Sequence, residues 1–525
     1  MDTRTGANRI AASGVQSQRA ATGRPSRPSA LGRPSYPPGV PSLRLAALVV
    51  ATACAIVGLP AIASAAVLRP LVTGVTDPET FSSANAAVAF RRVRASGATT
   101  AVLTLDWSAV APSGASPPAG FDASDPGDAR YHWAAIDRQV SLAVRTKLDP
   151  IIDIVDAPRW AQPRTAKAPY QPDPAAFGDF AHAAALRYSG GYAMLPRVRY
   201  WEAWNEPNLT TFLLPQFLDG RPFSPGWYRT MVNAFAAGVH SAARGNVVIA
   251  GATAPFADRG VDEVADWGPL TFMRDLLCLS ASLQPTCSDK ITFDVWSTHP
   301  YTSGGPKHHA FRRDDVSLGD LPKMRRILLA AQRAHHIRLT RSGLGFWVTE
   351  FSWDSSPPDP QAVPIMTLQQ WIPRALYVMW LNGITHVTWF TIHDDPMSSS
   401  TLQSGLYFNG GSFARDKAKP FLANFRFPVV VVIQAGGAHV WGRTPAGLPA
   451  GVAIQTTSTS GWRTVGSATT DKYGIFQTRV QGALGTYVRA VIPASGDASG
   501  RFRVKPIADH FYNPFGTTPP LEPQG

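Results

Sequence analysis

The chain has 525 residues, of which 45% are apolar and 16% are charged, and its formal net charge at pH 7 is +13. This length exceeds that of a single small domain and suits a large barrel followed by an accessory module. Seven arginines and one acid occupy residues 1–66, the other charges are scattered, and no RNA- or DNA-binding motif occurs, so nucleic acid is excluded as an expected partner.

The first predicted element is a secretory signal peptide in residues 1–66 with a long basic beginning. The apolar run Leu45–Val57 is followed by Pro60 and by the small residues of Ala63–Ala65. A basic, then apolar, then cleavable segment is typical of such peptides. An uncleaved membrane anchor is the alternative, because the apolar span through Val67 is just long enough to cross a bilayer. We therefore expect a secreted or extracellular protein, attached to the cell surface if the segment is retained.

Residues 67–428 alternate short apolar runs with amphipathic stretches. The predicted strands are Leu71–Val75, Thr100–Leu105, Pro150–Val155, Val198–Trp204, Asn246–Ala250, Thr292–Thr298, Gly345–Thr349 and Val387–Phe390. The predicted helices are Ser82–Ala95, Ala134–Arg145, Ala175–Tyr188, Gly226–Ala243, Leu270–Ser280, Leu321–His335 and Leu368–Leu381. This order predicts an α/β fold, a parallel sheet closed into a (β/α)8 TIM barrel. An open doubly wound sheet is the alternative, but no Gly-rich phosphate turn follows the first run.

The pattern changes in residues 429–505, where short alternating runs are separated by Gly-, Ser- and Thr-rich turns. The predicted strands are Gly451–Gln455, Thr464–Thr469, Gly474–Val480, Tyr487–Ile492 and Arg501–Val504. This spacing predicts a small antiparallel β-sandwich. Trp441 and Trp462 are candidate sugar platforms, with core packing as the alternative for at least one of them. Residues 506–525, rich in Pro, Gly and Thr, predict an irregular tail.

The cysteines agree with an exported protein. Cys54 lies in the apolar signal run, whereas Cys278 and Cys287 bracket a short polar loop. In an oxidising compartment we expect a disulfide that closes this loop, and two free thiols are the alternative. No metal site is expected here, because neither a histidine nor a further cysteine accompanies the pair at ligand spacing.

The most informative segment is Tyr200–Asn208, with the sequence Tyr-Trp-Glu-Ala-Trp-Asn-Glu-Pro-Asn. Pro207 cannot continue a strand, so Asn205 and Glu206 are predicted at the carboxyl end of a barrel strand, where barrel enzymes build their active sites. A carboxyl group between aromatic residues and away from water favours its acid form, as a general acid requires.

A second segment, Gly345–Trp353, carries Glu350 at the end of another apolar run. Glu206 and Glu350 fall on the fourth and seventh predicted strands, whose ends face each other across a barrel. Two carboxylates across a sugar-sized cleft suit glycosidic bond cleavage, and a separation of about 5 Å gives retention of configuration. Each acid alone would more often be solvated or paired, and we interpret Glu202 as a structural acid inside the barrel.

The motifs at Trp204–Asn208 and Trp347–Phe351 resemble those of clan A glycoside hydrolases. The sequence is most similar to the family 39 and family 5 types, which include xylosidases, iduronidases and endoglucanases. The resemblance spans residues 71–428 but is specific at these two motifs and few others. It implies that Glu206 is the acid/base and Glu350 the nucleophile.

The same resemblance implies substrate-binding residues. Asn205 would hold the sugar 2-hydroxyl near the nucleophile, and Tyr301 or His299 would hydrogen-bond Glu350 or a sugar hydroxyl. Trp389 on the eighth strand would lie beneath the reacting sugar. The alternatives are a satisfied histidine at a strand end and core packing for Trp389.

Other positions leave the pattern incomplete. Many clan members carry an arginine at the end of the second strand, where this chain has Asp106-Trp107, so the sugar is not predicted. Trp160, after the third strand, would either line the cleft or pack a loop. The sandwich resembles the immunoglobulin-like accessory modules of exported bacterial enzymes, which implies glycan binding or a spacer role.

The sequence therefore predicts a secreted retaining glycoside hydrolase that acts on a β-linked oligo- or polysaccharide without a metal or organic cofactor. A non-catalytic carbohydrate-binding or cell-surface interaction protein on the same scaffold is one alternative, which two intact glutamates disfavour. A metal-dependent barrel hydrolase is another. Its candidate ligands are His308-His309, His335-His336 and His393-Asp394-Asp395.

Overall fold

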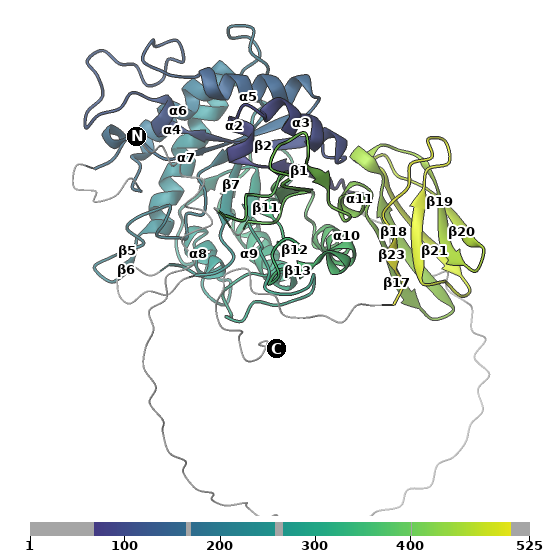
Figure 1. The fold of residues 1–525 in the computed structure, drawn as a ribbon. Coiled ribbons are helices and arrows are strands. Elements are labelled where there is room, and N and C mark those ends of the chain that lie inside the picture. The colour runs from purple at the N-terminus through teal and green to yellow at the C-terminus, as the bar shows by residue number, and fades with distance from the viewer. Residues whose placement is uncertain (1–67, 164–169, 258–265, 399, 401, 506–525) are drawn as a thin grey trace, which may run out of the picture. The chain divides into compact units, whose positions relative to one another are not determined.

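A computed structural model describes residues 68–163, 170–257, 266–398, 400 and 402–505 (Figure 1). The predicted signal peptide with Cys54 and the predicted tail lie outside these residues. Within the described part of the chain, no helix is both long enough and apolar enough to cross a bilayer.

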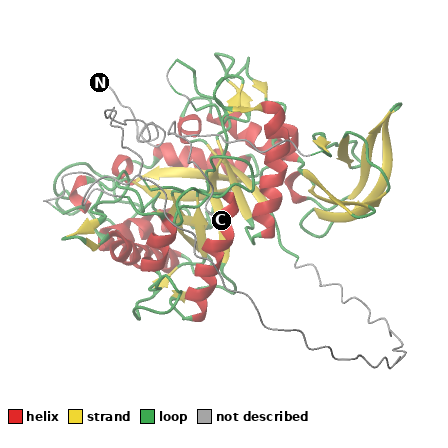
Figure 2. Cartoon of the chain, turned by 90° about the horizontal axis from the view of Figure 1, so that it is seen from below, coloured by secondary structure: helices red, strands yellow, loops and turns green. Residues whose placement is uncertain are grey.

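Eight parallel strands close into a barrel, and helices surround it (Figure 2). The barrel strands are β1 Val72–Thr76, β2 Thr100–Asp106, β3 Asp149–Val155, β4 Tyr200–Ala203, β7 Val247–Thr253, β9 Val295–Thr298, β11 Gly345–Phe351 and β14 His386–Phe390. Each strand pairs with its successor in this order, and β14 pairs with β1 to close the ring. The predicted (β/α)8 fold is confirmed, and each of the eight predicted runs contributes a barrel strand.

Each predicted amphipathic stretch contains a helix, and two short helices, Trp107–Val110 and Leu422–Arg426, were not predicted. The helices are α2 Pro78–Ser82, α3 Ala86–Ala95, α4 Trp107–Val110, α5 Ala134–Arg145, α6 Pro174–Arg187, α7 Ser224–Ala242, α8 Pro269–Leu276, α9 Leu321–Arg333, α10 Ile365–Leu381 and α11 Leu422–Arg426. The predicted helix Ser82–Ala95 is wrong because two helices replace it. The Ser83 hydroxyl donates to the Thr80 carbonyl and accepts from the Asn85 N–H, which competes with continued helical bonding.

Glycines allow α6 and α7 to pack closely against each other. A Cβ at Gly238 would collide with the carbonyl oxygen of Gly178, and a Cβ at Gly178 would press against Ala234. The start of α6 is fixed by Asp173, whose carboxylate accepts the Ala176 N–H at 2.9 Å. α7 also packs against β4, the strand that leads to Glu206, and its Tyr228 hydroxyl donates to the Ala203 carbonyl.

Short elements lie in the loops between the barrel strands and helices. Two-stranded pairs are formed by β5 Phe217–Leu218 with β6 Arg221–Pro222, β8 Ile291–Thr292 with β10 Ile337–Arg338, β12 Ser355–Ser356 with β13 Val363–Pro364, and β15 Tyr407–Phe408 with β16 Lys417–Ala418. Single 3-10 turns lie at Arg159–Ala161, Leu318–Asp320 and Pro445–Gly447.

The inside of the barrel holds its own small apolar cluster, separate from the layer between strands and helices. Its members come from alternate positions of neighbouring strands, as the two-residue period of a strand requires. They are Val102, Ile151, Val247, Ile249 and Val295, with Tyr200 and Trp347 packed against them. The strand ends on the carboxyl side of this cluster carry polar residues instead.

The chain beyond the barrel forms two antiparallel sheets, consistent with the predicted β-sandwich (Figure 1). One sheet contains β17 Val429–Gln434, β18 Gly437–Arg443 and β21 Ile475–Gln481, and the other contains β20 Gly461–Thr469, β19 Gly451–Ser458, β22 Tyr487–Val491 and β23 Phe502–Arg503. The five predicted strands are present. Alternation does not predict β17, because Val429–Ile433 is a continuous apolar run of which only the first half is buried.

The two tryptophans of this region occupy different environments. Trp441 is 0% exposed, and its ring packs against Tyr377 and Trp380 of α10 with centroid distances of 5.0 and 5.8 Å. Trp462 is half-buried beneath the Arg489 guanidinium, 4.3 Å from its ring centre. Trp441 is therefore a core residue that joins the sheet to the barrel helix.

The structure links Cys278 and Cys287 in a disulfide with a Cα–Cα distance of 5.2 Å. Cys278 directly follows the end of α8, and the bridge closes the loop between α8 and β8. The Leu279–Pro285 bridge of backbone hydrogen bonds lies within the same loop.

Replacing Trp441 with alanine will lower the free energy of unfolding by about 3 kcal/mol or more, because a large buried ring leaves a cavity. Trp462→Ala is the matched control, and we expect it to cost about 1 kcal/mol, since its ring is partly hydrated. Urea unfolding followed by circular dichroism measures both. Equal losses in the two variants would contradict the core assignment of Trp441.

Candidate active site

The carboxyl ends of β4 and β11 bring Glu206 and Glu350 together inside the barrel mouth. A carboxylate oxygen of one lies within 4.8 Å of a carboxylate oxygen of the other. The two residues are only 7% and 8% exposed. Two acids that are far apart in the sequence thus form one buried pair at the face where barrel enzymes carry out chemistry.

The backbone leaves β4 through an unusual turn. Trp204 and Glu206 have φ angles of 73° and 39°, in the left-handed region that bulky residues seldom adopt. The Glu206 N–H donates to the Ala252 carbonyl at 3.0 Å, which ties the turn to the end of β7. Such strained residues cost on the order of 1 kcal/mol each and concentrate at functional sites.

Glu206 is the member of the pair that keeps its proton. Burial and, to a smaller extent, the negative charge of Asp266 together raise the pKa of its carboxyl to about 8. His299 Nδ1 lies 3.0 Å from Glu206 Oε1, so the two groups share a hydrogen bond. At neutral pH Glu206 can therefore act as a proton donor.

Glu350 lies in a different set of contacts. The Tyr301 hydroxyl donates to Glu350 Oε1 at 2.5 Å. Burial raises the pKa of Glu350 above its usual value, and Glu206 adds to this, while His299 and the Tyr301 hydroxyl lower it. Glu350 thus has donors that stabilise its ionised form, as an attacking carboxylate needs.

The structure assigns Tyr301 and His299 to different acids. Tyr301 contacts Glu350, whereas the two ring nitrogens of His299 contact Glu206 and, at 3.3 Å, the Thr349 hydroxyl. The sequence interpretation placed either residue beside Glu350 or a sugar hydroxyl. It did not foresee a contact of His299 with Glu206, because the side-chain direction at a strand end is set by the loop that follows.

Asn205 lies beside Glu206 in the sequence and is 6% exposed. Its side-chain Nδ2 has no hydrogen-bond partner among the described residues. An unused buried amide donor costs free energy, commonly about 1–3 kcal/mol. A ligand hydroxyl in the cleft is one group that would satisfy it.

Trp389 faces away from the carboxyl pair, which corrects the prediction that it lies beneath the sugar. On the same strand His386 stacks on Trp347 inside the barrel, so the alternation along β14 turns Trp389 outward. The Trp389 indole N–H donates to the Ser404 carbonyl at 2.8 Å, and the residue is 1% exposed. Phe390 is the aromatic residue that this alternation directs inward at the strand end.

Trp160 packs a loop, the second of its two predicted alternatives. Its indole N–H donates to the Pro112 carbonyl at 2.8 Å, and its ring lies edge-on to Trp107 and Phe121. These contacts join the loops after β2 and β3. None of the contacts described for Trp160 reaches the carboxyl pair, so the assignment of Trp160 to substrate binding is not supported.

A second pair of acids, Asp153 and Glu202, lies deeper in the barrel on neighbouring strands in register. Glu202 accepts hydrogen bonds from the hydroxyls of Ser297 and Thr349, in agreement with a structural acid. Asp153 was missed by the sequence analysis. A single charged residue within the apolar run Ile151–Ile154 was the signal that could have identified it.

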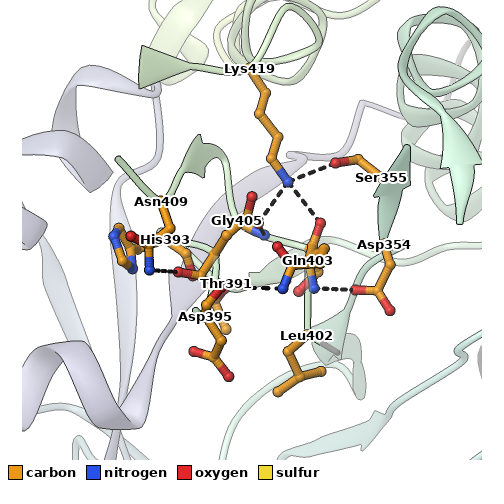
Figure 3. Close-up of polar contacts among 12 residues, drawn as sticks. Asp354, Ser355, Thr391, His393, Asp395, Leu402, Gln403, Gly405, Asn409 and Lys419 are labelled. Carbon is orange, nitrogen blue, oxygen red and sulfur yellow. Dashed lines mark hydrogen bonds and ion pairs between the residues drawn. The ribbon is translucent and has the colours of Figure 1, made fainter. Parts of the chain in front are cut away.

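A buried lysine fixes the loops that follow β11 and β14 (Figure 3). Lys419 Nζ donates to the Ser355 hydroxyl at 2.8 Å, the Gln403 carbonyl at 2.7 Å and the Asp394 carboxylate at 2.6 Å. Burial lowers the pKa of Lys419 and raises that of Asp394 to about 6, while their mutual attraction opposes both shifts. These loops flank Glu350, so the lysine rigidifies one side of the cleft.

Glu206, His299 and Glu350 are the side chains of the site that could hold a metal ion, since their ligand atoms lie within 4.8 Å of one another. Each of them already has a hydrogen-bond partner in the protein. Cys278, Cys287 and Asp289 form a second such group, but the two sulfurs are bonded to each other.

The histidine groups proposed as metal ligands do not assemble into a metal site. His309 pairs with Asp320, His336 bonds the Leu277 carbonyl, and His393 lies 3.1 Å from Asp416. None of the three sequence pairs belongs to a group of three metal-capable side chains in the part of the chain that the structure describes.

No protein-family model and no curated protein matches this sequence. Solved structures do match. A family 39 glycoside hydrolase from Bacteroides cellulosilyticus WH2 has 15% identity and a TM-score of 0.47 over 79% of each chain. A glucosidase from Croceicoccus marinus has 13% identity and a TM-score of 0.44, over 79% of this chain and 94% of the other. A family 30 endoxylanase from Clostridium papyrosolvens C71 has 11% identity and a TM-score of 0.41, over 79% and 95%.

Replacing Glu206 with glutamine will stabilise the protein increasingly as the pH rises. The pKa of Glu206 is about 8 in the folded chain and about 4.3 in an unfolded one. The wild type therefore loses stability between these values, on the order of 4 kcal/mol, whereas the neutral amide does not. Melting temperatures of both proteins at about pH 5 and about pH 9 test this.

Asp219→Asn is the control for this experiment, because the Asp219 side chain is exposed between β5 and β6. We expect Asp219→Asn to follow the wild-type pH dependence closely. A Glu206→Gln variant whose advantage does not grow with pH would contradict the raised pKa of Glu206.

Proposed function

We propose that the protein is a retaining glycoside hydrolase that acts on a β-linked oligo- or polysaccharide, with Glu206 as acid/base and Glu350 as nucleophile. The spacing of the two carboxyl groups carries this proposal, because their oxygens approach within 4.8 Å. Retaining glycosidases separate the two groups by about 5–5.5 Å, and inverting enzymes separate them by about 6.5–9.5 Å to admit a water.

In the first step the Glu350 carboxylate attacks the anomeric carbon while the glycosidic C–O bond breaks. Glu206 gives its proton to the departing oxygen, so the leaving group departs as a neutral alcohol. Burial supports this role by keeping Glu206 protonated near neutral pH. The Asn205 amide, whose Nδ2 has no partner among the described residues, would donate to a sugar hydroxyl next to the reacting carbon.

In the second step a water attacks the anomeric carbon and the bond to Glu350 breaks. Glu206 accepts the proton of that water, which restores the starting state of both acids. Formation of the glycosyl ester removes the negative charge of Glu350, and the pKa of Glu206 falls as a result. One residue can thus act as an acid in the first step and as a base in the second.

Two buried acids at this spacing favour catalysis over carbohydrate binding alone. Burial raises the pKa of both residues, so keeping them costs stability at neutral pH. A binding protein gains nothing from that cost, since neutral hydrogen-bonding groups would hold a sugar as well.

The proposal includes export from the cytoplasm, with retention at the cell envelope if the N-terminal segment stays attached. The Cys278–Cys287 bridge supports it, because disulfides persist mainly in oxidising compartments. We further propose that the C-terminal sheets form an immunoglobulin-like accessory module, on which Trp462 is the partly exposed aromatic residue.

The first experiment is hydrolysis of aryl β-glycosides by wild type, Glu350→Ala and Glu206→Ala, each with and without azide. Wild type will release the sugar with retained configuration. In Glu350→Ala azide will replace the missing nucleophile and give an inverted glycosyl azide. In Glu206→Ala azide will attack the glycosyl enzyme and give a retained azide.

Glu79→Ala, which removes an exposed carboxylate, is expected to give no azide product. Addition of EDTA to wild type tests the alternative of a metal-dependent hydrolase, and we expect no loss of activity. A wild type that hydrolyses no aryl glycoside and no polysaccharide would contradict the proposal and favour the non-catalytic binding protein. Azide products of the opposite configurations would exchange the roles of the two acids.

Tyr301→Phe will move the acidic limb of the kcat/KM profile to higher pH. The Tyr301 hydroxyl lowers the pKa of Glu350, so its removal raises that pKa, and the nucleophile ionises later, by about one pH unit. Tyr228→Phe is the matched control, since the buried Tyr228 hydroxyl donates to the Ala203 carbonyl and contacts neither acid. A limb that moves equally in both variants would refute a specific role for Tyr301.

A further inference from the structure

A continuous line of hydrogen bonds runs beneath the carboxyl pair, and the proposed mechanism does not use its deeper half. The Ser297 and Thr349 hydroxyls lie 2.5 and 2.9 Å from the same oxygen, Oε1 of Glu202. Thr349 Oγ1 also lies 3.3 Å from His299 Nε2, and His299 Nδ1 lies 3.0 Å from Glu206. Glu202 is thereby connected to the proposed acid/base through two side chains.

Glu202 is the ionised member of the deeper pair, because two hydroxyl donors meet at its Oε1. Asp153 Oδ1, in contrast, has no hydrogen-bond partner among the described residues. Burial together with the charges of Glu202 and Glu350 raises the pKa of Asp153 well above its usual range. The proton of this pair therefore resides on Asp153.

Titratable groups face Glu202 from several of the elements packed around it. They are Asp153 on β3, Tyr228 on α7, His299 after β9 and Glu350 on β11. Burial raises the pKa of Glu202, whereas His299 and the two hydroxyls lower it. Glu206 is faced by Asp266, His299, Glu350 and Tyr301.

The ionised Glu202 fixes the direction of each hydrogen bond in the line. Thr349 has one hydroxyl proton and donates it to Glu202, so toward His299 it can only accept. His299 Nε2 must then carry a hydrogen. In the neutral ring Nδ1 is left with a lone pair, which faces Glu206 Oε1. That contact is a hydrogen bond only if a proton lies between the two atoms.

We propose that Glu202 is a positioning residue which, through Thr349 and His299, keeps one proton on the His299–Glu206 pair and so keeps Glu206 ready to donate. Its effect on catalysis rests on the proposed function. The tautomer of His299 does not depend on the proposed function, because it follows from the hydrogen bonds alone.

Two variants break the line at different points. In Thr349→Val, the Nε2 atom of His299 loses its hydrogen-bond acceptor. The ring hydrogen can then reside on Nδ1, which donates to an ionised Glu206. In Glu202→Leu the acceptor of the Thr349 hydroxyl is removed, so Thr349 turns its proton toward Nε2 and Nδ1 again gains the hydrogen. A donor to the carboxylate lowers the pKa of Glu206 in both variants.

The first measurement is 15N NMR of the full chain labelled with [15N]histidine, with His299 assigned by comparison with His299→Gln. Near neutral pH we expect a protonated Nε2 in wild type and in Thr349→Ser, which keeps the hydroxyl. We expect a bare Nε2 with a protonated Nδ1 in Thr349→Val and Glu202→Leu. This readout needs no substrate, so it decides the inference even if the protein proves inactive on every glycoside.

The second measurement is the pH dependence of kcat/KM on an aryl glycoside. The alkaline limb, set by the pKa of Glu206 near 8, will move down by about one pH unit in Thr349→Val and Glu202→Leu. It will stay in place in Thr349→Ser. It will also stay in Ser297→Ala, which removes the other donor to Glu202 but leaves the path to His299 intact.

A bare Nε2 in the wild type would overturn the inference, as would variants that keep both the wild-type tautomer and the wild-type limb. A limb that moves in Glu202→Leu but not in Thr349→Val would also overturn it, because the charge of Glu202 would then act on Glu206 through space. An inactive wild type with the expected tautomers would refute the proposed function and leave the inference standing.

Discussion

Two buried carboxyl groups within 4.8 Å of each other cannot both be ionised without a large cost, and much of the barrel interior is arranged around this constraint. Glu350 receives the Tyr301 hydroxyl, which stabilises its charge, while Glu206 faces His299 and keeps a proton. The two acids differ through their partners, since both are buried to a similar degree. Hydrogen bonds thereby distinguish the two acids, as the proposed roles of proton donor and nucleophile require.

The closed barrel and its loops provide the contacts that hold the two acids close together. Its strands hold the two acids from opposite sides, and the strained turn at Trp204 and Glu206 is fixed by a bond to β7. The loop side of the cleft is secured by Lys419, a buried cation with three acceptors. Both supports consist of bonds within the protein. The proposed chemistry needs the two acids held in place, since about 1 Å of misplacement costs much of the rate.

The repeating order of elements was readable from the sequence, because burial imposes a period of two on strands and 3.6 on helices. The eight barrel strands and most helices follow from it. The break near Ser83 and the strand Val429–Gln434 did not follow. In the first a hydroxyl competes with the helix for backbone groups, and in the second a uniformly apolar run has no period to detect.

The sequence by itself determined the fold class and the two acids, because a strand that ends in proline or a polar loop presents its last residues at the barrel mouth. Only the tertiary structure decided what surrounds them. Side chains of β14 alternate between the two faces of the barrel wall, with Trp389 pointing outward and Phe390 inward. The pairing of neighbouring strands placed Asp153 beside Glu202. These contacts join residues that are distant along the chain, and a side chain's partners there depend on closure of the whole barrel, which no local pattern encodes.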